Sequence, residues 1–207
     1  MRLIDGLALR GTPARIPSST RNELPELFVK LGFNIGAEIG IYKGLFTKRF
    51  CDLGLTMYAI DAWQAYPGSG RDLHDQVTQD VLFESTRVLF SPYANCRILR
   101  CTSYNALCHF KHDSLDFVYI DADHTFLATA QDIYYWSQKV RNGGIIAGHD
   151  YKCFNPNAPD AAIQVGPVVD AYMKAFNIKN WYTFGGSDEE SEDGLYDDRN
   201  LSWMYFK

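Results

Sequence analysis

The chain has 207 residues and a formal net charge of −5, with 46% hydrophobic and 22% charged residues. This length and composition predict one globular domain with a sizeable core. The acidic balance argues against a broad phosphate-binding surface, so we expect no nucleic-acid partner.

The sequence also disfavours a membrane protein and a disulfide-bonded protein. No apolar run reaches the roughly 18 residues that suggest a membrane span, and the N-terminus lacks the basic start and apolar core of a signal peptide. The five cysteines are odd in number and include no C-x-x-C pair, which disfavours a disulfide framework or a zinc site. We therefore expect a cytoplasmic protein that does not bind a membrane.

The first residues of the chain carry little pattern. We interpret residues 1–19 as an arm or irregular cap, followed by a single domain over residues 20–207. Thr20 is a candidate N-cap for the next helix, and Glu23, three residues on, completes a capping box.

After this first helix, strands and helices alternate along the chain. The predicted strands cover residues 35–41, 55–60, 97–101, 114–121, 145–147, 180–184 and 201–206. The predicted helices between them cover residues 45–50, 76–90, 103–110, 126–140 and 168–176. Residues 64–75 are expected to form a surface loop or lid, residues 152–166 an irregular loop, and residues 185–200 a solvated hairpin connection. Such alternation predicts a mostly parallel sheet with helices on both faces.

The first strand ends in a glycine turn that precedes a helix. Glu38, Gly40 and Gly44 fill an acid-x-glycine-x-x-x-glycine pattern, which differs from the G-x-G-x-x-G dinucleotide fingerprint. Glycine permits a close approach of backbone to a ligand because it has no Cβ, although glycines at strand ends also serve as plain turn residues.

Polar residues follow several of the other strands. Asp61 lies 23 residues after Glu38, a spacing at which an acid binds ribose hydroxyls in doubly wound folds. Ser103, the run Asp121–His124 and the pair His149–Asp150 occupy further strand ends. Ligands of parallel sheets bind at these carboxyl ends, so the set predicts one site. Helix capping and hydrogen bonds to loop backbone are the structural alternatives.

Two motifs make a family resemblance specific. Asp121-Ala-Asp-His124 and the run from Asn142 to Tyr151, a glycine pair followed by Gly-His-Asp, resemble small stand-alone class I S-adenosylmethionine (AdoMet) methyltransferases. The resemblance covers about residues 20–206. It implies an α/β, Rossmann-like, doubly wound sheet of seven strands, mostly parallel with the last strand antiparallel. It also implies AdoMet as the methyl donor.

The resemblance assigns cofactor-binding roles to the glycine turn and to the strand ends. The backbone around Gly40 would contact the methionine part of AdoMet, and Glu38 would shape that turn or bind the amino-acid portion through water. Asp61 would hold the ribose hydroxyls, and Asp121 would face the methionine amino group or a metal. The implied cofactor-binding residues are Glu38, Gly40, Tyr42, Gly44, Asp61, Ala62, Trp63, Ser103 and Asp121, with Trp63 packing near the adenosine and Ser103 beside the adenine.

A divalent metal ion is a separate expectation. Asp121 and Asp150, 29 residues apart, occupy places comparable to the metal-binding acids of catechol-type and macrolide-sugar O-methyltransferases. Oxygen ligands favour Mg²⁺ or another divalent cation, which would lower the pKa of an acceptor hydroxyl. His124 or His149 would then be the catalytic base. The His-Asp run departs from the pattern of those families and leaves the third ligand unassigned.

We therefore expect an AdoMet-dependent methyltransferase that acts on a small molecule, at a hydroxyl oxygen, and a homo-oligomer is compatible with the sequence. Trp63, Tyr66 and Tyr151 are candidates for the acceptor pocket, although core packing explains aromatic residues equally well. Two alternatives stay open: a nicotinamide-dependent oxidoreductase, which the missing G-x-G-x-x-G disfavours, and a catalytically silent AdoMet-binding scaffold.

Overall fold

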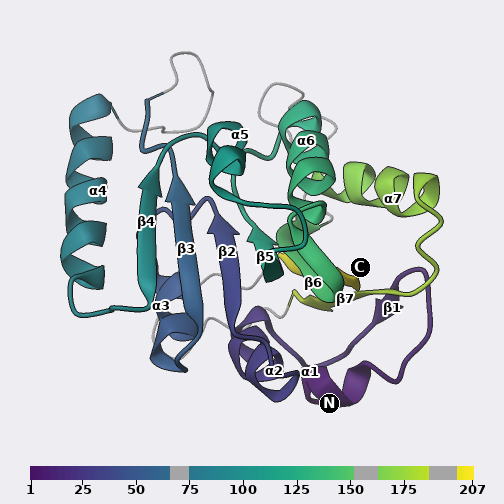
Figure 1. The fold of residues 1–207 in the computed structure, drawn as a ribbon. Helices are drawn as coiled ribbons and strands as arrows, with labels where there is room; N and C mark the ends of the chain where they lie inside the picture. The colour runs from purple at the N-terminus through teal and green to yellow at the C-terminus, as the bar shows by residue number, and fades with distance from the viewer. Residues whose placement is uncertain (66–74, 152–162, 187–199) are drawn as a thin grey trace.

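A single eight-stranded sheet forms the centre of the protein, with strand order β1-β7-β8-β6-β5-β2-β3-β4 (Figure 1). The computed structural model describes residues 1–65, 75–151, 163–186 and 200–207. The strands are β1 (Ala14–Arg15), β2 (Ile35–Ile39), β3 (Thr56–Asp61), β4 (Cys96–Arg100), β5 (Leu115–Ile120), β6 (Val140–Tyr151), β7 (Trp181–Gly185) and β8 (Leu201–Phe206). The helices are α1 (Leu3–Gly6), η1 (Arg21–Glu23), α2 (Leu24–Lys30), α3 (Leu45–Asp52), α4 (Gln76–Phe90), α5 (Ser103–Ala106), η2 (Leu107–His109), α6 (Phe126–Ser137) and α7 (Val165–Ala175).

Helices cover both faces of the sheet, as the alternating pattern predicted. One apolar cluster contains residues of α1, α2, α3 and α4, and the other contains residues of α5, α6 and α7. The central strand β5 is buried along its whole length. Because side chains alternate along a strand, Phe117 and Tyr119 join the first cluster while Val118 and Ile120 join the second.

The chain reverses its direction of travel across the sheet between β2 and β5. From β2 it proceeds outward to β3 and β4, and it then returns to place β5 on the other side of β2. Such a switch point opens a crevice at the carboxyl ends of the two central strands, where ligands of doubly wound folds bind. The residues that follow β2 and β5 are therefore neighbours in space.

The last strand is antiparallel, which confirms the sequence-based expectation. β8 lies between β6 and β7 and runs antiparallel to both. The register of β6 and β8 shifts between Gly148 and Tyr151, and Asp150 in this segment has a φ of 58°. This irregularity lies where β6 reaches the carboxyl-end edge of the sheet.

The expected strand count was wrong by one, because the N-terminal segment adds β1. β1 pairs in parallel with β7 at the edge of the sheet, with Ala14 opposite Tyr182. Leu3 and Ile16 are fully buried in the first apolar cluster. Two residues of β1 carry no strand periodicity, so the sequence could not reveal this pairing.

Element boundaries differ in places from those expected. The helix expected over residues 126–140 ends at Ser137, and Val140 already begins β6. Most of the three expected loops, including Tyr66, lies outside the described residues. Within the described part of the chain, every helix is too short or too polar to cross a membrane.

Candidate active site

The glycine turn after β2 lies against the backbone that follows β5. Gly40 has a φ of +87°, and a Cβ added there would lie 2.2 Å from the carbonyl oxygen of Asp121. Gly44 has a φ of +75° at the N-cap of α3, where a Cβ would lie 2.5 Å from the ring of Phe90. Both positions therefore require glycine.

Asp61, at the end of β3, joins two loops of the site. Its Oδ2 accepts a hydrogen bond from the backbone N–H of Tyr42 (2.9 Å), and its Oδ1 accepts one from the N–H of Trp63 (2.8 Å). Burial raises the pKa of Asp61, and these backbone hydrogen bonds oppose the rise. A carboxylate offers about four acceptor positions, so Asp61 can still accept hydrogen bonds from a diol.

Of the two aromatic residues near Asp61, Tyr42 is exposed and Trp63 is buried. The indole of Trp63 is 1% exposed, and its ring centroid lies 5.0 Å from that of Phe83 on α4. Its Nε1 donates a hydrogen bond to the carbonyl oxygen of Tyr42 (3.0 Å). Tyr42 is 47% exposed with a φ of 51°, and Ala62 is half-buried. Tyr42 therefore has the solvent-accessible ring at this edge of the sheet. The buried Trp63 holds the backbone of Tyr42 through its indole hydrogen bond.

Ser103 follows β4 but is engaged by helix α6. Its hydroxyl donates to the carboxylate of Asp132 and accepts a hydrogen bond from Nε1 of Trp136 (2.8 Å). Burial raises the pKa of Asp132 to about 6, although the hydrogen bond from Ser103 opposes this. Ser103 thus links α5 to α6 through these two hydrogen bonds.

Glu38 points into the core rather than into the open crevice. It is 3% exposed, and the hydroxyl of Thr47 on α3 donates a hydrogen bond to its carboxyl group. Burial raises the pKa of Glu38 to about 8, with Thr47 opposing and the charge of Asp121 adding to the rise. The side chain is therefore neutral at pH 7 and ties β2 to α3, close to the glycine turn that α3 follows.

Two acids and two histidines from the ends of β5 and β6 form a compact cluster. Nε2 of His124 lies 2.8 Å from Oδ2 of Asp150 and 3.4 Å from Oδ1 of Asp121. Nδ1 of His149 lies 3.5 Å from Oδ1 of Asp150 and 4.0 Å from Oδ2 of Asp121. The structure therefore brings together four of the five polar residues expected at these two strand ends. The fifth, Asp123, instead accepts a hydrogen bond from the backbone N–H of Thr125 (2.8 Å).

The two carboxylates hold His124 in its charged form. Burial opposes that charge, but Asp121 and Asp150 raise the pKa of His124 to about 9. In both acids burial favours the neutral form, yet the histidines, together with Arg21 in the case of Asp121, hold the pKa below its usual range. At neutral pH the cluster contains an imidazolium between two carboxylates, and an imidazolium cannot accept a proton.

The same residues fit a divalent metal ion. Asp121, His124 and Asp150 each offer one ligand atom, and these atoms lie within 4.8 Å of one another. Two carboxylate oxygens and one imidazole nitrogen would supply three ligands to such an ion, and other molecules would supply the rest. His124 is thus a candidate for the third ligand that the sequence left unassigned, and its Asp-x-x-His spacing from Asp121 was the available signal.

Arg21 is a site residue that the sequence did not suggest. It lies on η1, and its Nη1 donates to Oδ2 of Asp121 at 3.0 Å. Its side chain is 10% exposed, and its guanidinium carbon lies 5.3 Å from the ring centroid of Phe46. The two residues are 100 positions apart, so only the folded chain shows the pair.

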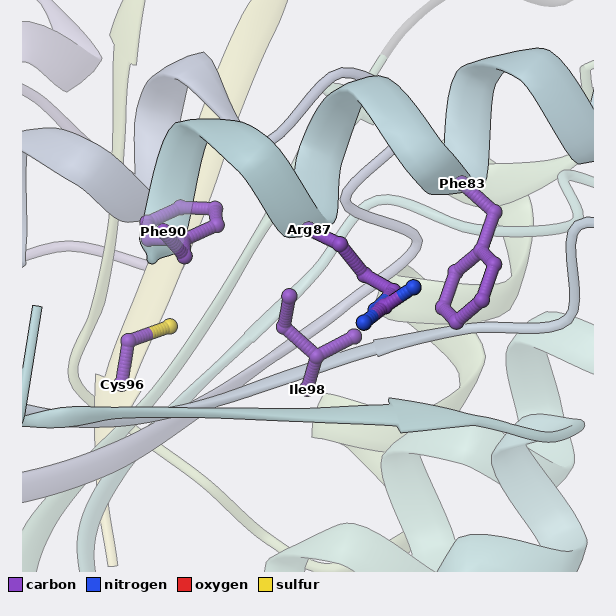
Figure 2. A pocket seen from close by; sticks show the side chains of 5 residues that line it. All are labelled: Phe83, Arg87, Phe90, Cys96 and Ile98. Carbon is purple, nitrogen blue, oxygen red and sulfur yellow. The ribbon is translucent and has the colours of Figure 1, made fainter. Parts of the chain in front are cut away.

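Two cavities lie away from this cluster. A cavity of about 250 Å³ lies between α4 and β4 and is lined by Phe83, Arg87, Phe90, Cys96 and Ile98 (Figure 2). A second, of about 430 Å³, involves α7, β7 and the segment Thr12–Pro13, and Tyr151 contributes to its wall. Neither is lined by the acids and histidines of the cluster, so we place the candidate site at the carboxyl ends of β2, β3, β5 and β6.

Comparison with known proteins identifies the family of the chain. The sequence profile of a family described as "Methyltransferase domain" matches residues 37–151, more than half of the chain. This segment begins in β2 and ends with β6, so it contains the glycine turn, Asp61 and the acid–histidine cluster. No curated protein matches the sequence significantly.

Solved structures with similar folds include three methyltransferases. The O-methyltransferase NovP has a TM-score of 0.58 and 19% identity, over 90% of this chain and 77% of that protein. The O-methyltransferase from Bacillus cereus, in complex with S-adenosylhomocysteine (SAH), has a TM-score of 0.59 and 14% identity, over 90% of this chain and 80% of that protein. An rRNA methylase from Streptococcus thermophilus has a TM-score of 0.58 and 13% identity, over 89% of this chain and 93% of that protein. At these identities the likeness establishes the fold alone.

Proposed function

The chain belongs to the methyltransferase-domain family of class I AdoMet-dependent enzymes, and we propose that it methylates a hydroxyl oxygen of a small molecule with the assistance of a divalent ion. The observation that carries this proposal is the meeting of the glycine turn at Gly40 with the cluster of Asp121, His124 and Asp150 at the switch point of the sheet. In this proposal the donor binds at the glycine turn, and the acceptor oxygen, with the proton it loses, lies at the cluster.

The donor would be held by residues of three strand ends. The backbone of the turn at Gly40, which packs against the backbone of Asp121, would contact the methionine part. Asp61 retains acceptor positions for the ribose hydroxyls. Tyr42 offers an exposed ring beside Asp61. AdoMet supplies an activated methyl group on its sulfonium, so the protein must mainly align an acceptor atom and remove its proton.

For the metal, we propose Asp121, His124 and Asp150 as ligands. An ion bound there would lower the pKa of an acceptor hydroxyl. Imidazole suits transition ions while carboxylates suit Mg²⁺ and Mn²⁺, so the mixed set favours Mn²⁺ over Mg²⁺. His124 must lose its proton to bind the ion, which leaves His149 as the candidate base. His149 is 6% exposed, and its Nδ1 lies 3.5 Å from Asp150.

Calorimetric titration with AdoMet and with SAH tests the donor site. We expect saturable binding to the wild-type protein and at least about tenfold weaker binding to Asp61→Asn, because an amide cannot replace both acceptor oxygens. Asp80→Asn is the control, since Asp80 is an exposed residue of α4 that pairs with Arg100. Absence of binding to the wild-type protein would refute the proposed donor site.

Transfer of a labelled methyl group from AdoMet tests the acceptor and the metal. A panel of catechols and sugar hydroxyls is compared with ribosomal RNA, each with Mn²⁺ and with EDTA. The net charge of −5 leads us to expect label in a small molecule. Label in RNA would overturn the acceptor class, and transfer unaffected by EDTA would overturn the metal.

A further inference from the structure

We propose that Arg21 is a positioning residue that orients the carboxylate of Asp121 for its ligand, so that the segment before α2 forms part of the active site. The inference rests on the proposed function, because Asp121 must serve AdoMet or a metal ion for its orientation to matter. Arg21 itself would act through Asp121 rather than touch the reacting atoms.

The carboxylate of Asp121 has two oxygens with different neighbours. Oδ2 accepts a hydrogen bond from Nη1 of Arg21 at 3.0 Å, whereas Oδ1 lies 3.4 Å from Nε2 of His124. The guanidinium thus holds Oδ2, which also lies 4.0 Å from Nδ1 of His149, and leaves Oδ1 to face His124. An ion pair of this kind is charge-assisted, which makes it stronger and more directional than a neutral hydrogen bond.

Arg21 also balances charge in a buried place. Asp121 and Asp150 both lie beside Nε2 of His124, and two carboxylates that close repel each other when both are ionised. Arg21 places a positive charge beside Asp121, with its Nη1 3.0 Å from Oδ2. Without Arg21, Asp121 would lose its fixed partner and would be free to turn its Oδ1 away from the ligand position.

The short helix η1 is anchored on both sides, which fixes the base of the Arg21 side chain. The Thr20 side chain and the Glu23 carboxylate form a complete capping box around Arg21. Glu23 also accepts a hydrogen bond from the backbone N–H of Leu3 (2.8 Å). The carbonyl oxygen of Ser19 accepts one from Gly185 at the end of β7 (2.8 Å). The Arg21 guanidinium then lies over the Phe46 ring.

A second arginine–aspartate ion pair lies at the other end of β5, with a more exposed arginine. Asp116 at the amino end accepts a hydrogen bond from Nε of Arg141 (2.6 Å), and the Arg141 guanidinium lies 5.2 Å from the ring of Phe33. Asp116 faces backbone N–H groups of residues 34 and 35 rather than the crevice. This pair supplies an internal control for the loss of an arginine–aspartate contact without a ligand nearby.

The experiment is a double-mutant cycle of Arg21→Met and Asp121→Asn, with Arg21→Lys and Arg141→Met as further variants. Calorimetry measures the Kd of AdoMet and of Mn²⁺, and urea unfolding measures stability. Asp121→Asn identifies which ligand Asp121 serves. We expect Arg21→Met to weaken the binding of that same ligand about tenfold and to cause no further loss of affinity in the Asp121→Asn background.

Two variants separate positioning from stability. Arg21→Lys keeps the charge without the planar fork, so it should restore part of the affinity that Arg21→Met loses. Arg141→Met should lower the urea midpoint and leave both Kd values within about twofold. If Arg21→Met does not fold, the cycle is completed with Arg21→Lys.

The outcomes are distinguishable. Unchanged ligand affinity in Arg21→Met, or additive losses in the double variant, would overturn the role of Arg21 while wild-type binding of AdoMet upholds the proposed function. If Asp121→Asn weakens the binding of neither AdoMet nor Mn²⁺, the role of Arg21 is likewise overturned while the proposed function stands. Failure of the wild-type protein to bind AdoMet or Mn²⁺ would overturn both.

Discussion

Replacing Glu38 with Gln should change how the stability of the protein depends on pH. Glu38 is buried, and its pKa is raised from 4.5 to about 8 in the folded protein. An unfolded chain therefore releases this proton at a lower pH than the folded chain does. A group of this kind makes the folded state less stable as the pH rises between its two pKa values. Gln cannot ionise, yet its carbonyl oxygen can still accept the hydrogen bond from Thr47.

The size of the effect follows from the two pKa values. Between them, the free energy of unfolding falls by about 1.4 kcal/mol for each pH unit. From pH 5 to pH 7.5 the wild-type protein should therefore lose about 3 kcal/mol that Glu38→Gln does not lose. Typical domains are stable by roughly 5–15 kcal/mol, so this difference is a large part of the total stability.

Urea denaturation at pH 5, 6, 7 and 7.5 measures this difference. The gap between Glu38→Gln and wild type should widen steadily with pH, in favour of the variant. Glu26→Gln, at an exposed position of α2, is the control and should run parallel to the wild type. Parallel curves for Glu38→Gln and wild type would show that Glu38 titrates alike in both states, which would refute the reasoning.

Three further predictions concern the glycine turn, α6 and the metal site. Gly40→Ala places a Cβ 2.2 Å from the Asp121 oxygen and should abolish AdoMet binding in calorimetry, whereas Gly54→Ala, with a similar φ of +84° and nothing within 4 Å, should only lower the urea midpoint. Asp132 has a pKa raised to about 6, so its ionisation should lower the free energy of unfolding by about 2 kcal/mol between pH 4 and pH 6. Asp132→Asn should remove this contribution in urea denaturation. The same pH dependence of stability in the variant and the wild type would contradict the prediction. His124 has a pKa of about 9 and must lose its proton to bind a metal, so Mn²⁺ affinity should rise about tenfold per pH unit from pH 6 to 8. His124→Ala should lose that binding, and exposed His109→Ala should keep it, as titration calorimetry will show.

Much of the fold could be predicted because the signals are local. The capping box of Thr20 and Glu23 forms as expected, and the strand–turn–helix unit around Gly40 lies where its pattern places it. Gly-rich turns and capping residues act through their own backbone geometry, so a few neighbouring letters specify them. The ends of parallel strands share one edge of a sheet, and for this reason Asp121, His124 and Asp150 could be grouped before their contacts were known.

Other features depend on how distant elements are placed. The side chain of Trp63 turns beneath α4, and Ser103 is bound by Asp132 of α6, because the packing of those helices decides which partner each side chain meets. The edge strand β1 gains its structure from β7 rather than from its own two residues. None of these partners lies within a helical turn or a hairpin of the residue it binds.

The sequence by itself determined three features: the order of strands and helices after the N-terminal segment, the glycine turn, and the polar residues at the carboxyl edge of the sheet. Each of them rests on spacing along the chain. Only the tertiary structure decided how those residues work together. It placed Arg21 against Asp121 from 100 positions away and set His124 between two carboxylates. The physical reason is that charge and hydrogen bonding act over a few ångströms in space, and a chain folds residues that are far apart in sequence to within that distance.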